Sequence, residues 1–204
     1  MLLSGVLRPS TGRITSAGAV FFECDLQEAF RGKICKWNTV VSTARLLMDA
    51  ARIMTIPVIA TEQYPERLKG TVAELPLDGV AVFSKRSFSM ITEETERKLN
   101  EWPARRSAIL FGIETHVCVQ QTALDLLARD WDVHVVVDGV SSIRMFDRAV
   151  ALHRMEKSGA YLVSAESLLF ELLRTSTDPN FKAVSGLIKQ HAETHNEFSH
   201  MEVI

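Results

Sequence analysis

Residues 108–130 read AILFGIETHVCVQQTALDLLARD, and this stretch points to the fold of the whole chain. The apolar run over 108–111 predicts a short strand that is buried on both faces and that ends at Gly112. Thr115 is a typical N-cap residue, so we expect a helix from Thr115 to Asp130. A buried strand that leads into a helix is the repeating unit of a parallel α/β sheet.

The same alternation of short apolar runs and amphipathic segments extends over most of the chain. It predicts an α/β fold of the three-layer α-β-α, Rossmann-like type, with six parallel strands between two layers of helices. In such a sheet a ligand binds beyond the carboxyl ends of the strands. The other strands are expected at 19–24, 57–61, 79–83, 133–137 and 160–163, and the other helices at 37–54, 92–102, 147–158, 165–173 and 180–189.

Length and composition indicate one globular domain. The chain has 204 residues, of which 47% are hydrophobic and 24% are charged, which are ordinary values for a soluble protein. We expect a loose leader over 1–16, a single domain over 17–190 and a polar tail over 191–204. The net charge is −2, so general nucleic-acid binding is not expected. No apolar run approaches the roughly 18 residues of a membrane span, so no membrane partner is expected either.

The cysteines and the first residues bear on the compartment. The three cysteines form no CxxC motif and no even set, which favours free thiols in a reducing compartment. No acidic residue precedes Glu23, while Arg8 and Arg13 stand among serines and threonines, which weakly resembles a mitochondrial transit segment. Two arginines make a poor signal of that kind. A cytoplasmic location is therefore the preferred prediction, and a mitochondrial one is the alternative.

Three residues with reactive side chains stand where predicted strands end. Asp25 closes the first strand, Lys85 follows the third, and Cys118 lies in the first turn of the helix after the fourth. A thiol becomes a strong nucleophile when it ionises, and a helix N-terminus favours the thiolate. A carboxylate can accept the thiol proton, and a lysine can stabilise the negative charge. Taken one at a time, each residue is also typical of an ordinary role as a turn aspartate, a surface lysine or a buried cysteine.

Several familiar catalytic motifs are absent from the sequence. The first strand is followed by CDLQE at 24–28 instead of a GxGxxG, and no P-loop is present, so the phosphate cradles of nucleotide-binding folds are missing. No GxSxG occurs either, which disfavours a serine α/β-hydrolase.

Three motifs resemble those of the isochorismatase-like, or cysteine hydrolase, superfamily. They are FECDLQEAF at 22–30, KRSFS at 85–89 and GIETHVCV at 112–119, and the likeness keeps the same order from about residue 17 to residue 175. The resemblance implies a six-stranded parallel sheet, the isochorismatase-like hydrolase fold. It also implies a catalytic triad, in which Asp25 is the general base, Lys85 the charge stabiliser and Cys118 the nucleophile.

The resemblance further implies how the surroundings of the triad are built. It implies a cis peptide between Ile113 and Glu114, which aims the backbone N–H groups near Val117 and Cys118 into an oxyanion hole. A second set of residues is expected to line the substrate pocket or else to support the triad: Phe30, Gln63, Tyr64, Phe88, Glu114 and His116. His116 is equally well placed to face solvent.

The chain departs from the metal-dependent members of that family. Nicotinamidases in the family carry an Asp-x-His metal site and further histidines after the second strand, where this sequence has TEQY at 61–64. All six histidines come after the lysine motif, so the ligands of such a site are missing. We expect no metal and no other cofactor, which disfavours nicotinamidase activity. Isochorismate cleavage is also a less favoured prediction, since membership of a family does not fix the substrate.

The preferred functional hypothesis is a metal-independent cysteine hydrolase that acts on a small amide or a related C–N or C–O bond. The alternative is a non-catalytic interaction module that keeps the fold, although a scaffold has no need of a lysine buried beside a carboxylate and a thiol. Members of the superfamily commonly form oligomers, so we expect a homo-oligomer, a dimer or a tetramer, together with a small-molecule substrate.

Overall fold

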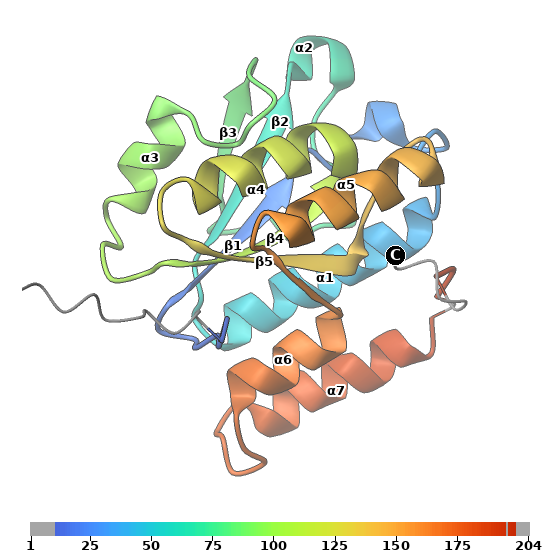
Figure 1. Ribbon diagram of the computed structural model, residues 1–204. Coiled ribbons are helices and arrows are strands. Elements are labelled where there is room, and N and C mark those ends of the chain that lie inside the picture. Colours follow the sequence, from blue (N-terminus) through green and yellow to red (C-terminus); the bar gives the residue numbers. More distant parts are fainter. Residues whose placement is uncertain (1–10, 195, 199–204) are drawn as a thin grey trace, which may run out of the picture.

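A single six-stranded sheet organises the molecule (Figure 1). The computed structural model describes residues 11–194 and 196–198. The strands are β1 (Ala19–Cys24), β2 (Val58–Gln63), β3 (Ala81–Lys85), β4 (Ser107–Ile113), β5 (Asp132–Ser141) and β6 (Tyr161–Val163). They lie in the order β3-β2-β1-β4-β5-β6, and every neighbouring pair is parallel. The predicted α/β architecture with six parallel strands is therefore confirmed.

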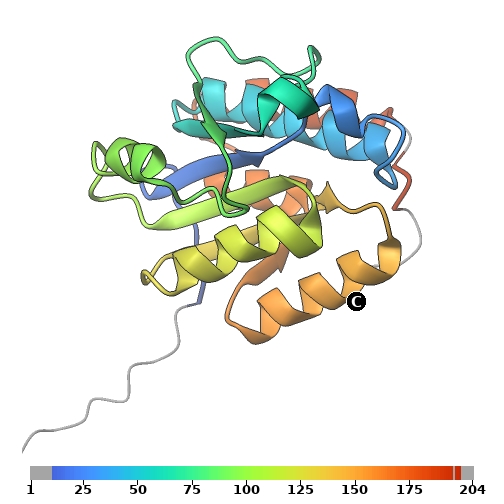
Figure 2. The same ribbon diagram turned by 90° about the horizontal axis from the view of Figure 1, so that it is seen from above.

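Helices cover both faces of this sheet (Figures 1 and 2). One face carries α1 (Trp37–Ile53), α6 (Ala165–Leu173) and α7 (Phe181–Ala192), and the other carries α3 (Glu93–Leu99), α4 (Gln120–Leu127) and α5 (Met145–Lys157). Three short segments complete the fold: the 3-10 helix η1 (Glu28–Phe30), the helix α2 (Pro65–Leu68) and the π-helical turn η2 (Thr115–Val119).

The central strand β1 is apolar except for Glu23. All six of its residues are buried, and their side chains alternate between the two faces of the sheet. Phe21 joins the apolar cluster under α1, while Phe22 joins the cluster under α4. Each ring meets another aromatic ring edge-on, since Phe21 packs against Phe111 and Phe22 against Trp131. A strand that is covered on both sides keeps no polar face, as expected for a parallel sheet.

The connections between strands determine where a ligand site forms. From β1 the chain passes outward through β2 to β3, then returns to β4 and continues outward through β5 to β6. The connections that follow β1 and β4 therefore lead to opposite halves of the sheet, and in folds of this kind ligands bind at that switch point. Asp25 directly follows β1, and Cys118 lies in the turn after β4.

Several local expectations differ from the structure. β5, expected at 133–137, runs over Asp132–Ser141. β3 ends at Lys85, so this lysine belongs to the strand instead of following it. β4 continues through Gly112 to Ile113. The next helix begins with the π-helical turn, in which the N–H of Val119 bonds the carbonyl of Glu114 five residues back. Thr115 is therefore not the N-cap: Glu114 takes that position, and the Thr115 hydroxyl is buried, with no hydrogen-bond partner among the described residues.

The two ends of the described chain pack more closely than the sequence predicts. Ile14, within the stretch expected to be a loose leader, is fully buried, and its N–H donates to Glu171 Oε1 at 3.2 Å. Helix α7 runs to Ala192, and the N–H of Glu197 donates to Thr39 Oγ1 at 3.0 Å. Residues 1–10 of the predicted leader, with Arg8, lie outside the described residues. Within the described part of the chain, no helix has the length and apolar character that a membrane span requires.

Candidate active site

A buried ion pair marks the carboxyl end of the sheet. Lys85 Nζ lies 2.7 Å from Asp25 Oδ2, and both side chains are almost fully shielded from solvent. Lys85 ends β3 and Asp25 follows β1, so the pair spans the intervening strand β2. Two predicted site residues that are 60 positions apart in sequence are thus brought into direct contact.

Hydrogen bonds compensate both buried charges. Thr61, on β2, donates its hydroxyl to Asp25 Oδ1 at 2.8 Å. The Lys85 ammonium donates to Gln63 Oε1 at 2.8 Å, to the carbonyl of Phe88 at 2.9 Å and to that of Ser87 at 3.3 Å. A buried ion pair is tolerated only when such additional bonds satisfy its remaining donors and acceptors.

The environment favours a basic carboxylate beside a charged lysine. Burial raises the pKa of Asp25 above its ordinary value, although the charge of Lys85 opposes this effect. Burial lowers the pKa of Lys85, but the acidic groups of Cys24, Asp25 and Cys118 outweigh that effect and raise it above its ordinary value. An aspartate with a raised pKa is a better proton acceptor, which suits a general base.

The backbone at Asp25 is unusual for a residue that is not glycine. Its φ of 53° lies in the left-handed region, which aspartate tolerates better than most residues. The N–H of Asp25 donates to the carbonyl of Thr61, and the carbonyl of Asp25 accepts from the N–H of Gln27. The N–H of Leu26 donates to the buried Glu23 Oε1 at 2.9 Å. These bonds turn the chain sharply after β1 and hold the carboxylate toward Lys85.

Cys118 completes the group from the other side of β1. The residue is 7% exposed, and its thiol lowers the pKa of the Asp25 carboxyl. The Thr122 hydroxyl donates to the carbonyl of Cys118 at 2.7 Å and accepts from the N–H of Met90 at 2.9 Å. Thr122 thus ties the turn that carries the thiol to the loop whose carbonyls accept from Lys85.

The turn after β4 contains the cis peptide and the backbone N–H groups that were expected to form an oxyanion hole. The peptide bond between Ile113 and Glu114 is cis. The N–H of Val117 donates to the carbonyl of Glu114 at 3.0 Å, so this N–H already has a partner within the turn. The Glu114 carboxylate accepts from the N–H of Ile143 at 2.9 Å, which anchors the turn to the segment after β5.

Of the residues expected to line a pocket, Gln63, Tyr64 and Phe88 contact the lysine. Gln63 bonds the ammonium and also donates its amide to the carbonyl of Arg86 at 3.0 Å. The N–H of Tyr64 donates to the carbonyl of Lys85, and the Arg86 guanidinium lies 3.4 Å from the centre of its ring. Phe88 gives its carbonyl to Lys85, while its side chain is 51% exposed. Gln63 therefore supports the Lys85 ammonium, whereas Tyr64 and Phe88 reach Lys85 through backbone groups.

His116 and Phe30 lie away from the ion pair. His116 Nδ1 is 3.0 Å from Ser142 Oγ and 3.9 Å from Glu114 Oε2, at the end of β5. Phe30 packs against the apolar cluster under α1, whereas Cys118 belongs to the cluster under α4. His116 and Phe30 therefore lie in different parts of the structure. Among the described hydrogen bonds, neither residue contacts Lys85 or Asp25.

Some residues that build the site were not predicted as members of it. Thr61 and Thr122 each bond a triad residue, and Cys24 places its Sγ 3.7 Å from Asp25 Oδ2. Gln27 holds the chain after β2, since its side chain accepts from the N–H of Gln63 and donates to the carbonyls of Gln63 and Lys69. Thr61 could have been found from its place at the end of a strand beside β1. Cys24 and Gln27 belong to the first recognised motif but had received no role, and Thr122 follows the third motif.

The last residues of β2 use their polar side chains for the predicted triad residues. Thr61 bonds Asp25, and Gln63 bonds Lys85, at the position where a metal-dependent relative would carry ligands. In the residues that the structure describes, no group of three or more His, Cys, Asp and Glu side chains lies close enough to hold a metal ion.

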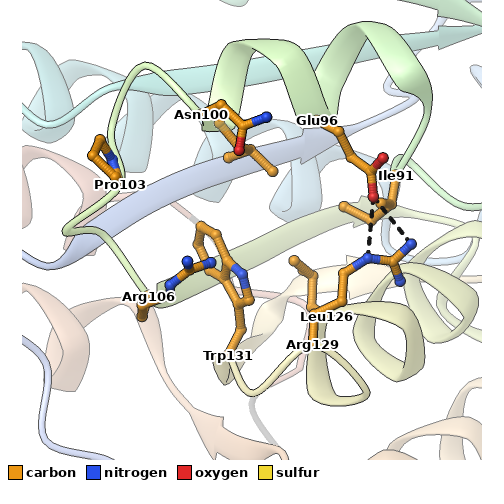
Figure 3. A pocket seen from close by; sticks show the side chains of 9 residues that line it. Ile91, Glu96, Asn100, Pro103, Arg106, Leu126, Arg129 and Trp131 are labelled. Carbon is orange, nitrogen blue, oxygen red and sulfur yellow. Dashed lines mark hydrogen bonds and ion pairs between the residues drawn. The ribbon is translucent and has the colours of Figure 1, made fainter.

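A separate cavity of about 360 Å³ lies at the opposite end of the sheet (Figure 3). Arg106 directly precedes β4 and Trp131 directly precedes β5, so these lining residues stand at the amino ends of the strands. The Arg106 guanidinium lies 5.5 Å from the centre of the Trp131 ring, and Glu96 pairs with Arg129 at 3.1 Å across the cavity's other side. None of the triad residues lines this cavity.

Comparison with known proteins defines the class to which this site belongs. Residues 19–167 match the isochorismatase domain, and the chain belongs to that family. It is 45% identical to the secreted isochorismatase effector Isc1 of Phytophthora sojae, with 92% of each chain covered. It is 43% identical to isochorismatase domain-containing protein 2 of Homo sapiens, with 91% of this chain and 90% of that protein covered. TEQYP at 61–65 also resembles the branch of that name.

A further relative is longer than this chain. Isochorismatase domain-containing protein 1 of Salmo salar is 47% identical over 89% of this chain, which spans 64% of the length of that protein.

Solved structures give the same fold. The MAR1 ribonuclease of Caenorhabditis elegans is 42% identical, with a TM-score of 0.85 over 93% of this chain and 98% of that one. The YcaC gene product of Escherichia coli, described as an octameric hydrolase of unknown specificity, has a TM-score of 0.82 over 91% of this chain and 93% of that one. At 22% identity, that second likeness shows the fold alone.

Proposed function

We propose that this chain is a cysteine hydrolase that cleaves a small amide or a related C–N or C–O bond without a metal ion. Asp25, Lys85 and Cys118 form its triad. The observation that carries the proposal is the buried Asp25–Lys85 pair beside the Cys118 thiol. A buried ion pair contributes little to stability compared with apolar packing, so its presence beside a thiol favours a chemical role.

The reaction follows the scheme of covalent catalysis. The Asp25 carboxylate accepts the proton of the Cys118 thiol, and the sulfur attacks the substrate carbonyl carbon. The backbone N–H of Cys118 receives the oxyanion, since those of Val117 and Val119 already bond the carbonyl of Glu114, and Lys85 stabilises the negative charge. The C–N bond then breaks, and the amine leaves with the proton held by Asp25. Water attacks the thioester with Asp25 again as base, which releases the acid and restores the thiol.

Alkylation of the three cysteines tests the activated thiol directly. Iodoacetamide should label Cys118 well below pH 8, ahead of Cys24 and Cys35, and peptide mapping identifies each site. The variants Asp25→Asn and Lys85→Met should both slow labelling of Cys118. Equal and slow labelling of all three cysteines in the wild-type protein would contradict the proposal.

The substrate class needs its own assay. We expect release of ammonia or an amine from a panel of small amides, with isochorismate included as a C–O substrate because one relative bears that name. Cys118→Ala should abolish turnover and keep the fold, while Cys35→Ser serves as the matched control. Turnover that persists in the Cys118→Ala protein would exclude this cysteine as the nucleophile.

A second candidate activity comes from the solved relative that is named a ribonuclease. At 42% identity over nearly the whole chain, this name justifies a direct assay on single-stranded and double-stranded RNA. The net charge of −2 supplies no general attraction for phosphate, so we expect weak, salt-sensitive cleavage or none. RNA cleavage that is lost in Cys118→Ala would assign that activity to the same site.

Self-association is the interaction we propose for the surface of α5. Phe146 is 77% exposed and Val150 is 54% exposed, one helical turn apart, and Ile143 just before the helix is 47% exposed. Exposed apolar side chains that cluster in this way are typical of interfaces. The alternative function, a non-catalytic oligomeric module, would be supported if Cys118→Ala retained the protein's cellular role.

A further inference from the structure

Cys24 is a buried thiol that the proposed reaction does not use. It is fully buried at the end of β1, and its Sγ lies 3.7 Å from Asp25 Oδ2. The Cys118 thiol raises the pKa of Cys24 and lowers that of the Asp25 carboxyl, and both cysteines belong to one buried cluster. Two free thiols therefore lie in the surroundings of one carboxylate.

The backbone brings the two cysteines into the same buried cluster. Cys24 pairs with Gly112 across the β1–β4 ladder, six positions before Cys118. A Cβ atom on Gly112 would lie only 2.1 Å from the carbonyl oxygen of Cys24, so the absence of a side chain lets the two strands pack closely here. The turn after β4 then returns Cys118 to the same face, where both cysteines belong to one apolar cluster.

We propose that Cys24 is a resolving cysteine for Cys118, so that oxidation of Cys118 by a hydroperoxide leads to a reversible Cys24–Cys118 disulfide. In the first step the Cys118 thiolate attacks the peroxide, whose O–O bond breaks to give a sulfenic acid and hydroxide. In the second step Cys24 attacks the sulfenic sulfur, the S–O bond breaks, and water leaves with the Cys24 proton. The peroxide is reduced by two electrons, which the two thiols supply.

The surroundings of the two thiols favour this division of roles. Burial raises the pKa of the Cys24 thiol well above its ordinary value, so Cys24 stays protonated and does not compete with Cys118 for the oxidant. Asp25 lies beside Cys24 and can accept its proton when the sulfur attacks. The third cysteine is separate from the pair, since Cys35 donates its thiol to the carbonyl of Ile143. The proposed Cys24–Cys118 disulfide rests on the proposed function in one respect: Cys118 must be the thiol that reacts first.

Peptide mapping after peroxide treatment tests the pair in the wild-type protein. Trypsin cleaves after Arg and Lys, so it places the three cysteines on three different peptides, 14–31, 34–36 and 107–129. Protein treated with a few equivalents of hydrogen peroxide should lose about 2 Da and give a disulfide-linked pair of peptides 14–31 and 107–129. Dithiothreitol should restore iodoacetamide labelling of Cys118.

Two serine variants supply the matched comparison. In Cys24→Ser, peroxide should instead add about 32 Da to the peptide of Cys118, as sulfinic acid, and dithiothreitol should no longer restore labelling. Cys35→Ser should behave as the wild type. The proposal is overturned if treated wild-type protein carries sulfinic acid on Cys118 without a link to Cys24, or if a disulfide involves Cys35 instead. Labelling of the untreated protein reports separately on whether Cys118 is activated, so failure of the proposed function is distinguishable.

Discussion

Lys85 reaches Asp25 across the width of an intervening strand. The ammonium Nζ lies 2.7 Å from Oδ2, although Lys85 ends β3 and Asp25 follows β1. The strand between them supplies Thr61 to the carboxylate and Gln63 to the ammonium. The two buried charges therefore stabilise each other with the help of side chains on β2. Removal of either charge should lower the stability of the protein.

Replacement of Lys85 by Met should destabilise the protein by about 3–5 kcal/mol, because it leaves the buried Asp25 carboxylate unpaired. The double variant Lys85→Met/Asp25→Asn removes both charges and should recover a large part of this loss. Urea unfolding of the wild type, both single variants and the double variant gives the coupling free energy of the pair. Simple additivity of the two single losses would contradict the view that these residues act as a unit.

Thr122→Val should lower the free energy of unfolding by about 1–3 kcal/mol, because the N–H of Met90 loses its acceptor in the interior. Labelling of Cys118 should also slow, since the bridge between the Lys85 loop and the Cys118 turn is broken. Thr122→Ser keeps the hydroxyl and should restore the labelling rate.

Thr43→Val is the matched control for that substitution. Thr43 is fully buried on α1, and its hydroxyl has no partner among the described residues. Removal of an unpaired buried hydroxyl should leave stability unchanged or raise it slightly. If both threonine variants lost equal stability, the hydrogen bonds of Thr122 would have no special part in holding the site.

Gly112→Ala should prevent stable folding or cost more than about 4 kcal/mol, which is exceptional for a single methyl group. The added Cβ would meet the backbone of Cys24 at 2.1 Å, and the φ of +118° at this position disfavours any other residue. Gly186→Ala, in helix α7, meets no atom within 4 Å and should stabilise the protein by about 1 kcal/mol. Thermal unfolding of both variants checks this contrast, and a tolerated Gly112→Ala would show that the strands can separate there.

Glu23→Gln should flatten the pH dependence of stability. Burial raises the pKa of Glu23 from 4.5 to about 8, and the charges of Asp25 and Glu62 add to this effect while Lys85 opposes it. Between these two pH values the folded state binds one more proton than the unfolded state. The contribution of Glu23 to the free energy of unfolding is therefore fully present below pH 4.5. It is lost as the pH rises from 4.5 through about 8, by about 1.4 kcal/mol per pH unit.

Urea unfolding between pH 5 and pH 9 measures that slope in both proteins. Gln keeps an oxygen that can accept from the N–H of Leu26, so the turn before Asp25 should survive the substitution. Glu93→Gln, on the exposed side of α3, should leave the slope as in the wild type. Identical slopes for all three proteins would show that Glu23 does not titrate in this range.

Phe146→Asp should reduce the oligomeric order of the protein in solution, because it places a charge in the apolar surface of α5. Light scattering coupled to size-exclusion chromatography measures the mass of each species. Phe146→Leu keeps the apolar character and should assemble as the wild type does. An unchanged mass for Phe146→Asp would place the interface elsewhere.

The sequence predicted the buried strands well because each carries its signal locally. β1 was expected at 19–24 and lies at those residues, since a strand covered on both faces reads as a nearly continuous apolar run. The start of the helix after β4 was not predictable in the same way. Thr115 has the side chain of a cap, yet its hydroxyl is enclosed and the turn is π-helical. That outcome depends on how the chain packs after leaving the sheet, which no local preference records.

The residues that bond the candidate triad show the same difference between what the sequence predicts and what tertiary packing decides. Gln63 was expected either to line a pocket or to support the triad, and it bonds the Lys85 ammonium, because β2 lies between the strands of the two charged residues. Cys24 was counted only as a free thiol, but it lies beside Asp25 and Cys118. Gln63 and Lys85, like Cys24 and Cys118, are far apart in the chain, so their proximity follows from strand order and register.

From the amino-acid sequence alone come the α/β class, the parallel sheet and the three candidate residues, because hydrophobic periodicity and short motifs are properties of neighbouring positions. The tertiary structure decided which side chains complete the site: Thr61 for the carboxylate, Gln63 for the ammonium and Thr122 for the turn that carries the thiol. A buried charge requires partners wherever the fold can supply them, and only the assembled sheet determines which residues those are.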